Sequence, residues 1–187
     1  MKIIFHQKYP KYILGARKLS GFMQCEACQL AKLRGEWIEE PTTALKQSSY
    51  VDAWASQELE QFKEDNPDMF LKSGELKADY RICDSIIEQI KADSMFLKYI
   101  TAGETQKIMT GTIANVPVKI KIDCFHSNKL LTDLKVIKDM KLLYNEKTHQ
   151  KENFIDYYDY VLQRKFVSRD CEAKYRQKTT IYNCSCN

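Results

Sequence analysis

The sequence contains no long hydrophobic run, and it has little glycine and proline. Its 187 residues include six glycines and four prolines, and its mean hydropathy is -0.49. No apolar stretch approaches the ~18 residues of a membrane-spanning helix, and the composition excludes collagen-like and low-complexity chains. The apolar start, Ile3 to Phe5, is cut off by His6 and is too short for the core of a secretory signal. We therefore expect a folded cytoplasmic protein with no membrane partner.

No Gly/Ser linker, internal repeat or long charge run divides the chain, so we expect one domain over residues 1–187. The net charge is +4, and residues 115–187 carry 14 Lys and Arg against 9 Asp and Glu. This basic excess can attract a polyanion, although scattered surface lysines would give the same count. The seven cysteines are odd in number and no export signal precedes them, which favours reduced thiols over a disulfide framework.

Apolar residues spaced three and four apart predict amphipathic helices in an N-terminal helical part, residues 1–105. These helices cover residues 19–33, a stretch from a cap at Ser48 or Ser49 to Asn66-Pro67, and residues 77–99.

Alternating apolar residues predict a sheet in the second part, residues 106–187, which would carry the catalytic groups. The expected strands are residues 106–113, 116–123 and 130–137, and they form an antiparallel meander. Asn153 can cap a helix that runs to residue 166, and residues 179–184 are a last strand. The fold class is therefore mixed α/β, with a central sheet flanked by helices.

Two aspartates face each other if the second and third strands pair symmetrically about Asn128. In that register Asp123 lies opposite Asp133 with β-carbons about 5 Å apart, and such like charges are unfavourable unless something neutralises them. A divalent cation with oxygen ligands, Mg²⁺ or Mn²⁺, would do so. Lys135 points to the same face as Asp133, where it can hold a phosphate or help to activate a water. An inactive, exposed ladder of Asp and Lys has the same pattern.

Asp123, followed ten residues later by Asp133-Leu134-Lys135, resembles the D…(D/E)xK core of the PD-(D/E)XK nucleases. Four segments extend the similarity to phage nucleases that resemble RecE, exonuclease VIII, over most of the chain. They are residues 45–54, the Met109-Thr110-Gly111 turn, residues 119–123 and residues 153–163. The resemblance implies a restriction-endonuclease-like core and a metal-dependent exonuclease that acts on double-stranded DNA in phage recombination or repair.

The resemblance also implies roles for single residues. Asp123 and Asp133 would bind Mg²⁺ or Mn²⁺ with help from the backbone carbonyl of Leu134, and Lys135 would position or activate the attacking water. Asp52 stands where many related nucleases carry a histidine on the preceding helix. An aspartate there is either a third oxygen ligand or a solvated helix carboxylate.

Two departures from the family pattern concern the end of the chain. Gln163 fits the first position of a Gln-x-x-x-Tyr motif that faces the site, but Val167 stands in place of the tyrosine. The sequence also ends soon after the last expected strand, where similar nucleases continue, which indicates a shortened or divergent member. The alternative function is a catalytically weak relative that binds DNA or a recombination partner without cutting it.

The resemblance further implies a ring-shaped homo-oligomer around DNA, a single-strand annealing protein as partner, and a bacterial or phage-infected cell. No Gly-x-x-x-x-Gly-Lys-Ser/Thr loop is present, so no fused ATP-driven motor is expected. Four thiolates, from Cys25-x-x-Cys28 and Cys184-x-Cys186, could hold a cluster, but their spacing differs from the usual arrangement. Structural thiols are the simpler interpretation.

Overall fold

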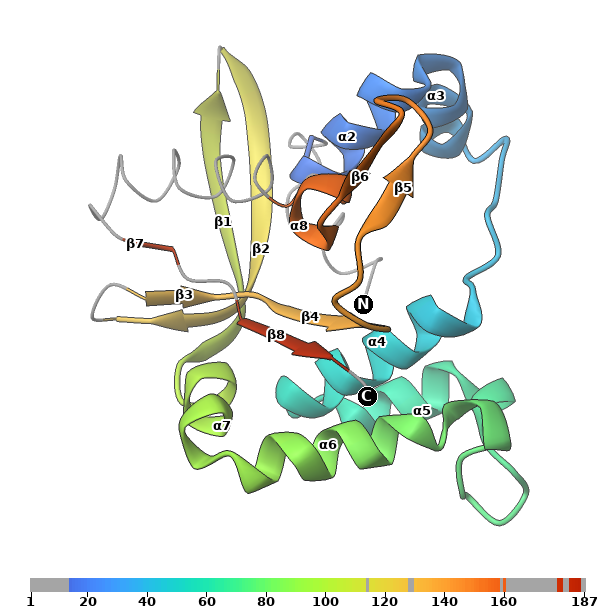
Figure 1. Cartoon of the computed structure of the whole chain (residues 1–187), viewed down its shortest axis with the longest axis vertical. Coiled ribbons are helices and arrows are strands. Elements are labelled where there is room, and N and C mark those ends of the chain that lie inside the picture. The colour runs from blue at the N-terminus through green and yellow to red at the C-terminus, as the bar shows by residue number, and fades with distance from the viewer. Residues whose placement is uncertain are drawn as a thin grey trace. The chain divides into compact units, whose positions relative to one another are not determined.

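A computed structural model of the chain describes residues 14–113, 115–127, 130–158, 160, 178–179 and 182–185 (Figure 1). The chain forms two compact units. Unit 1 consists of Met1–Glu39, Ile108–Lys121 and Lys141–Thr179, and unit 2 consists of Glu40–Lys107, Ile122–Met140 and Thr180–Asn187. The expected single domain over residues 1–187 stays a prediction.

Unit 2 contains a group of helices that pack on one another. They are α4 (Thr43–Ala55), α5 (Leu59–Asp65), α6 (Ile82–Ala92) and α7 (Ser94–Thr101), with the short 3-10 helices η1 (Pro67–Met69) and η2 (Ala78–Tyr80) between α5 and α6. α4 packs against α5 and α6, and α6 packs against α7, as can be followed in Figure 1. These elements correspond to the helical segments expected from the periodicity, but with more interruptions.

Polar side chains that cap the backbone explain these interruptions. The Thr42 hydroxyl accepts a hydrogen bond from the Leu45 N–H at 3.2 Å, so α4 begins earlier than the expected cap at Ser48 or Ser49. The Asp93 carboxylate accepts hydrogen bonds from two backbone N–H groups at the start of α7, which divides the helix expected over residues 77–99. A cap satisfies N–H groups that would otherwise lack a partner, and it fixes where a helix starts.

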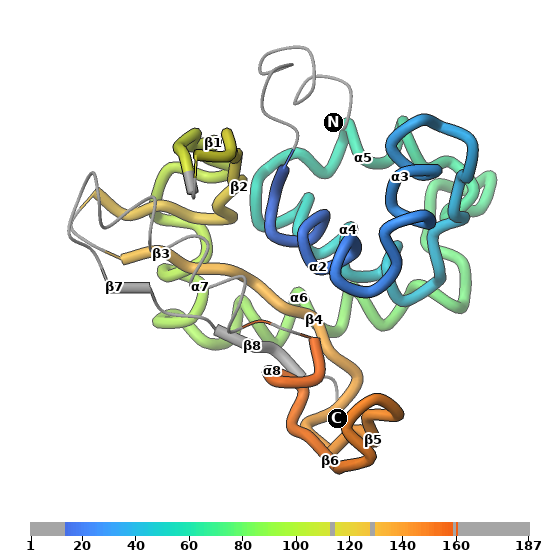
Figure 2. Tube along the Cα trace, turned by 90° about the horizontal axis from the view of Figure 1, so that it is seen from above, coloured from blue at the N-terminus to red at the C-terminus, as the bar shows by residue number. Residues whose placement is uncertain are grey.

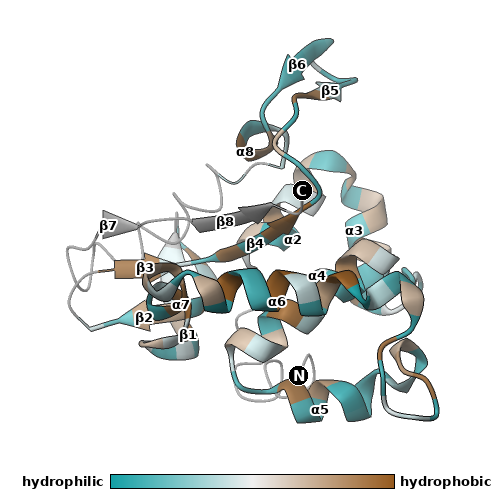
Figure 3. Cartoon of the chain, turned by 60° about the horizontal axis from the view of Figure 1, so that its bottom comes forward, coloured by the Kyte–Doolittle hydropathy of each residue, from teal (hydrophilic) through white to brown (hydrophobic). Residues whose placement is uncertain are grey.

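The core of unit 2 is built from the apolar faces of these helices. Its members are Tyr50, Val51, Ala55, Met69, Leu76, Cys83, Ile86, Ile87, Ile90, Ile100 and Leu134. Ile86 and Ile90 lie four residues apart on α6, which places them on one face, and they are 2% and 1% exposed. Figure 3 shows the resulting mixture of apolar and polar segments along α6. Burial of this face stabilises the scaffold on which the polar residues described below are carried.

Three strands follow one another in a sheet with the order β1 (Glu104–Ile113), β2 (Val116–His126) and β3 (Leu130–Thr132). β2 and β3 pair antiparallel, with Cys124 opposite Thr132 and His126 opposite Leu130. Each pair of residue numbers sums to 256, so the register expected from symmetry about Asn128 is confirmed. The pairing brings the next position of β2, Asp123, opposite the residue that follows β3.

The third expected strand, residues 130–137, is divided at Asp133. β4 (Leu134–Ile137) begins immediately after this residue, and it pairs in parallel with β8 (Tyr182–Ser185) rather than continuing along β2. The path from β3 into β4 can be followed in Figure 2. The presence of both antiparallel and parallel strand pairs, together with the helices, confirms the mixed α/β class. Asp133 therefore lies where the chain stops pairing with β2 and begins to pair with β8.

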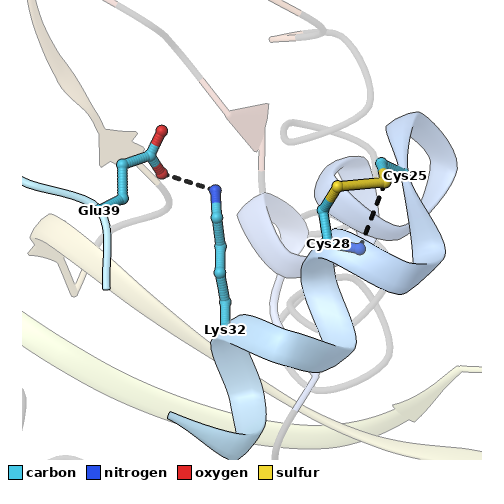
Figure 4. Close-up of polar contacts among 4 residues, drawn as sticks. All are labelled: Cys25, Cys28, Lys32 and Glu39. Atoms are coloured by element: carbon cyan, nitrogen blue, oxygen red, sulfur yellow. Dashed lines mark hydrogen bonds and ion pairs between the residues drawn. A yellow bond between two sulfur atoms is a disulfide. The ribbon is translucent and has the colours of Figure 1, made fainter. Parts of the chain in front are cut away.

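Unit 1 carries two consecutive helices, α2 (Ala16–Gln24) and α3 (Glu26–Arg34), where one helix over residues 19–33 was expected. Cys25 between them has extended backbone angles, and its sulfur accepts a hydrogen bond from the Cys28 N–H at 3.2 Å (Figure 4). Cys25 and Cys28 form a disulfide, so the expectation of reduced thiols is wrong for this pair. Cys83 and Cys124 are buried thiols that form no disulfide among the described residues, in agreement with the expected reduced state. Lys32 and Glu39 form an ion pair at 2.6 Å.

The remaining described elements of unit 1 are short. β5 (Leu143–Asn145) and β6 (Gln150–Glu152) pair antiparallel, and α8 (Phe154–Tyr157) and β7 (Lys178–Thr179) follow. The Asn153 side chain accepts hydrogen bonds from the N–H groups of Ile155 and Asp156, which confirms the predicted cap of α8. The expected continuation of this helix to residue 166 lies outside the described residues. None of the helices within the described ranges has the length and apolar character needed to cross a membrane.

Candidate active site

The two aspartates that the sequence analysis pairs lie near the end of β2 and at the break between β3 and β4. Asp123 precedes the ladder pair of Cys124 and Thr132, and Asp133 follows it directly. Lys135 forms an ion pair with the Asp133 carboxylate, so these two side chains are on the same side of the chain, as the alternation predicts. All three residues belong to unit 2.

A hydrogen bond fixes the Asp123 side chain at the break. Its Oδ2 atom accepts the backbone N–H of Leu134 at 2.9 Å. That N–H is the first of β4, and Leu134 itself is 4% exposed and packed in the core of unit 2. A single carboxylate oxygen therefore ties β2 to the start of β4, while the core holds the other end of the contact in place. This arrangement restricts the orientation of the carboxyl group before any ligand arrives.

Asp52 is the third carboxylate of this site. It lies on α4 between Val51 and Ala53, both of which are buried, so the core packing of α4 holds its backbone. Its charge raises the pKa of Asp123, which places the two carboxyl groups in the same electrostatic environment. The sequence leaves Asp52 as either a third oxygen ligand or a solvated helix carboxylate. Its effect on Asp123 favours membership of the acidic cluster over the solvated carboxylate.

Burial and neighbouring charges perturb the ionisation of Asp123. Burial has the largest effect, and the charges of Asp133 and Asp52 add to it, so the pKa of Asp123 rises from 3.8 to about 8. The ammonium group of Lys135 and the Leu134 N–H act in the opposite direction. At neutral pH a carboxyl group with this pKa is mostly protonated, and a nearby positive charge would favour its ionised form. A buried carboxyl group whose pKa is perturbed by burial and by neighbouring charges is also a feature of functional sites.

A cavity in unit 2 joins Asp52, Asp123 and Leu134 to three further polar side chains. Residues that line it include Asp52, Ser56, Gln106, Asp123, Thr132 and Leu134. Gln106 was not found by sequence reasoning, because a glutamine at the start of an expected strand has no distinguishing spacing. Its backbone has φ +54°, and its Oε1 atom is buried without a hydrogen-bond partner among the described residues.

The donor set of this cavity fits a hard divalent cation. Carboxylate and amide oxygens are ligands that Mg²⁺ and Mn²⁺ prefer, and a cation would offset the burial and the repulsion that raise the pKa of Asp123. Within the described ranges, no group of three or more His, Cys, Asp and Glu side chains is arranged to hold a metal ion. Asp133 forms an ion pair with Lys135, and one oxygen of Asp123 accepts the Leu134 N–H.

Of the six residues expected in the site, the structure brings five together. Asp123, Asp133, Leu134 and Lys135 surround the break between β3 and β4, and Asp52 approaches from α4. Gln163, the sixth, lies outside the described residues. Val167, which replaces the expected tyrosine, also lies outside them. The roles assigned to these side chains stay predictions.

Two acidic residues at adjoining β segments, with a lysine two positions after the second, define the site of a PD-(D/E)XK nuclease fold. The chain belongs to the family described as a PDDEXK-like domain of unknown function (DUF3799), whose model matches residues 17–183. This membership confirms the fold and the nuclease superfamily that the sequence indicates. The closer relation to RecE stays a prediction.

A solved structure supports the same assignment. The chain is similar to a protein from Eubacterium rectale, described as a candidate exonuclease, with 30% sequence identity and a TM-score of 0.85. The similarity covers 96% of this chain and 69% of the other. None of the curated proteins matches the chain.

Proposed function

We propose that this chain is a metal-dependent nuclease that hydrolyses phosphodiester bonds of double-stranded DNA from an end. The cluster of Asp52, Asp123 and Asp133 with Lys135 at the break between β3 and β4 carries this proposal. The description of the Eubacterium rectale protein as a candidate exonuclease agrees with it. The basic excess of residues 115–187 supports an anionic substrate.

The residues of the site divide the chemistry between them. Asp123 and Asp133 would supply carboxylate oxygens to the cation, and Asp52 and the Leu134 carbonyl would add further oxygen donors. A bound Mg²⁺ or Mn²⁺ supplies a Lewis acid that polarises the phosphate and lowers the pKa of water. Lys135, which forms an ion pair with Asp133, would place its ammonium group beside the attacking water or a phosphate oxygen. The Leu134 N–H holds Asp123 in orientation throughout.

We extend this proposal to the biological role of the nuclease. Digestion of a DNA end prepares single strands for a single-strand annealing protein, which is the partner we propose, in phage recombination or repair. A homo-oligomer enclosing the duplex would keep the enzyme on its substrate without ATP.

The test uses linear and circular duplex DNA with the full chain. We expect the wild type to release nucleotides from linear DNA in Mg²⁺ or Mn²⁺, to leave closed circular DNA intact, and to stop when EDTA is added. Asp133→Asn should lose this activity, while Asp79→Asn, which changes an exposed carboxylate, should retain it. Cleavage of the circle would contradict the preference for ends. A shifted but intact linear duplex in Mg²⁺ and Mn²⁺ would favour the DNA-binding relative instead.

A further inference from the structure

Gln106 has an unusual backbone conformation for a residue in a strand. It lies near the start of β1 in unit 2, with φ +54°. The left-handed region is unfavourable for residues other than glycine, and folded proteins retain it where the surrounding structure requires it, often at functional sites. Formation of the strand alone therefore does not explain this backbone conformation.

The surroundings of the Gln106 side chain provide an explanation for this conformation. It lines the same cavity as Asp52 and Asp123, and its Oε1 atom is buried with no hydrogen-bond partner among the described residues. Buried carbonyl oxygens in native structures nearly always have a partner, so an orphan oxygen beside carboxylates indicates a partner that binds there. A hydrated or bare cation is attracted by a neutral amide oxygen and by acidic groups together.

The charge of the cluster explains why an amide suits this position better than another acid. Asp133 and Asp52 already raise the pKa of Asp123, which shows that the carboxylates repel one another. A fourth carboxylate would increase that repulsion in the absence of a cation. An amide oxygen adds a donor for the cation without adding charge, so it completes an oxygen shell at no further electrostatic cost.

We propose that the amide oxygen of Gln106 is an additional ligand of the divalent cation held by Asp123 and Asp133. This inference rests on the proposed function, because it deepens the same site. It assigns a role to a residue that the acid-acid-lysine pattern does not contain. The cation shell then takes oxygens from β1, β2, α4 and the break before β4.

The experiment measures binding of Mn²⁺ alone by titration calorimetry, with no DNA present. Gln106→Met keeps the length of the side chain and removes the amide oxygen, and Gln106→Glu keeps an oxygen at the same place. Gln57→Met is a matched control, because Gln57 also has a positive φ of 61° but is exposed. Circular dichroism and thermal unfolding in EDTA check that each variant is folded.

We expect Gln106→Met to weaken Mn²⁺ binding about 10-fold or more, since loss of a supporting group costs roughly 10–100-fold in metal affinity. Its melting temperature in EDTA should be unchanged or higher, because an orphan buried oxygen is removed. Gln106→Glu should bind Mn²⁺ at least as tightly as the wild type, and Gln57→Met should bind it equally. A structural role alone would lower the melting temperature of Gln106→Met in EDTA and leave its Mn²⁺ affinity unchanged.

Other outcomes separate the inference from the function on which it rests. If the wild type binds Mn²⁺, Asp133→Asn does not, and Gln106→Met binds as the wild type does, the role of Gln106 is refuted and the metal site stands. If Gln106→Glu abolishes binding while Gln106→Met preserves it, the amide donates its N–H groups to the carboxylates, which also refutes the role. A wild type that binds neither Mn²⁺ nor Mg²⁺ overturns the proposed function together with the inference.

Discussion

The raised pKa of Asp123 makes the stability of the metal-free protein depend on pH. The unfolded chain releases this proton near pH 3.8, whereas the folded chain holds it until about pH 8. Between these values the folded state binds one more proton than the unfolded state, so the free energy of unfolding falls as the pH rises. Each pH unit in this window corresponds to at most about 1.4 kcal/mol for one proton, or about 3 kcal/mol from pH 5 to pH 7.

The substitution that isolates this effect is Asp123→Asn. Asparagine has nearly the same shape, retains an oxygen that can accept the Leu134 N–H, and carries no proton that titrates in this range. We expect the variant to lose most of the decline in stability between pH 5 and pH 8, and to be more stable than the wild type at pH 8.

Urea denaturation in EDTA at pH 5, 6, 7 and 8 measures this dependence, with Asp79→Asn as the control for an exposed carboxylate. Saturating Mg²⁺ should flatten the wild-type profile, since a cation stabilises the ionised form, and its stabilising effect should be larger at pH 8 than at pH 5. Equal slopes for the wild type and Asp123→Asn would refute the conclusion that burial and neighbouring acids perturb Asp123.

Two further substitutions test the site and its scaffold. Lys135→Met removes the ammonium group that pairs with Asp133. This variant should hydrolyse linear duplex DNA roughly 100-fold more slowly or worse, while its gel-shift affinity for DNA stays within about threefold of the wild type. Weakened binding at an unchanged rate would contradict this role. Ile90→Ala opens a cavity in the core of unit 2 and should lower the free energy of unfolding by about 2–5 kcal/mol. Ile82→Ala on the same helix, where the side chain is 40% exposed, should cost less than about 1 kcal/mol, and equal losses would contradict the core assignment.

Several features of the fold follow from local patterns in the sequence. The apolar alternation and the turn at Asn128 predict the pairing of β2 with β3, because a shift of one residue would turn every buried side chain to the wrong face. Asn153 predicts its own helix cap, since an asparagine oxygen satisfies the first free N–H groups within one turn. Register and alternation likewise predict that Asp123, Asp133 and Lys135 come together, whereas the nuclease superfamily is implied by the resemblance of these residues to the D…(D/E)xK core.

Other features of the fold cannot be predicted from periodicity, because alternative hydrogen-bond partners compete for the backbone. The helix expected over residues 19–33 breaks at Cys25, and the helix over residues 77–99 breaks at Asp93, because a side chain there offers the backbone another hydrogen-bond acceptor. The strand over residues 130–137 divides at Asp133, since β4 finds a parallel partner in β8, more than 40 residues away in the sequence. No short window contains that partner.

The sequence by itself determined which residues are acidic, basic or apolar and which of them share a face of one element. Those properties are local, and they were enough to pair Asp123 with Asp133 and to place Lys135 beside them. Only the tertiary structure decided that Asp52 approaches from α4 and that the Gln106 oxygen lies buried in the same cavity. The packing of the helices and strands of unit 2, such as α4 against β4, sets those positions, and such packing depends on contacts between residues that are far apart along the chain.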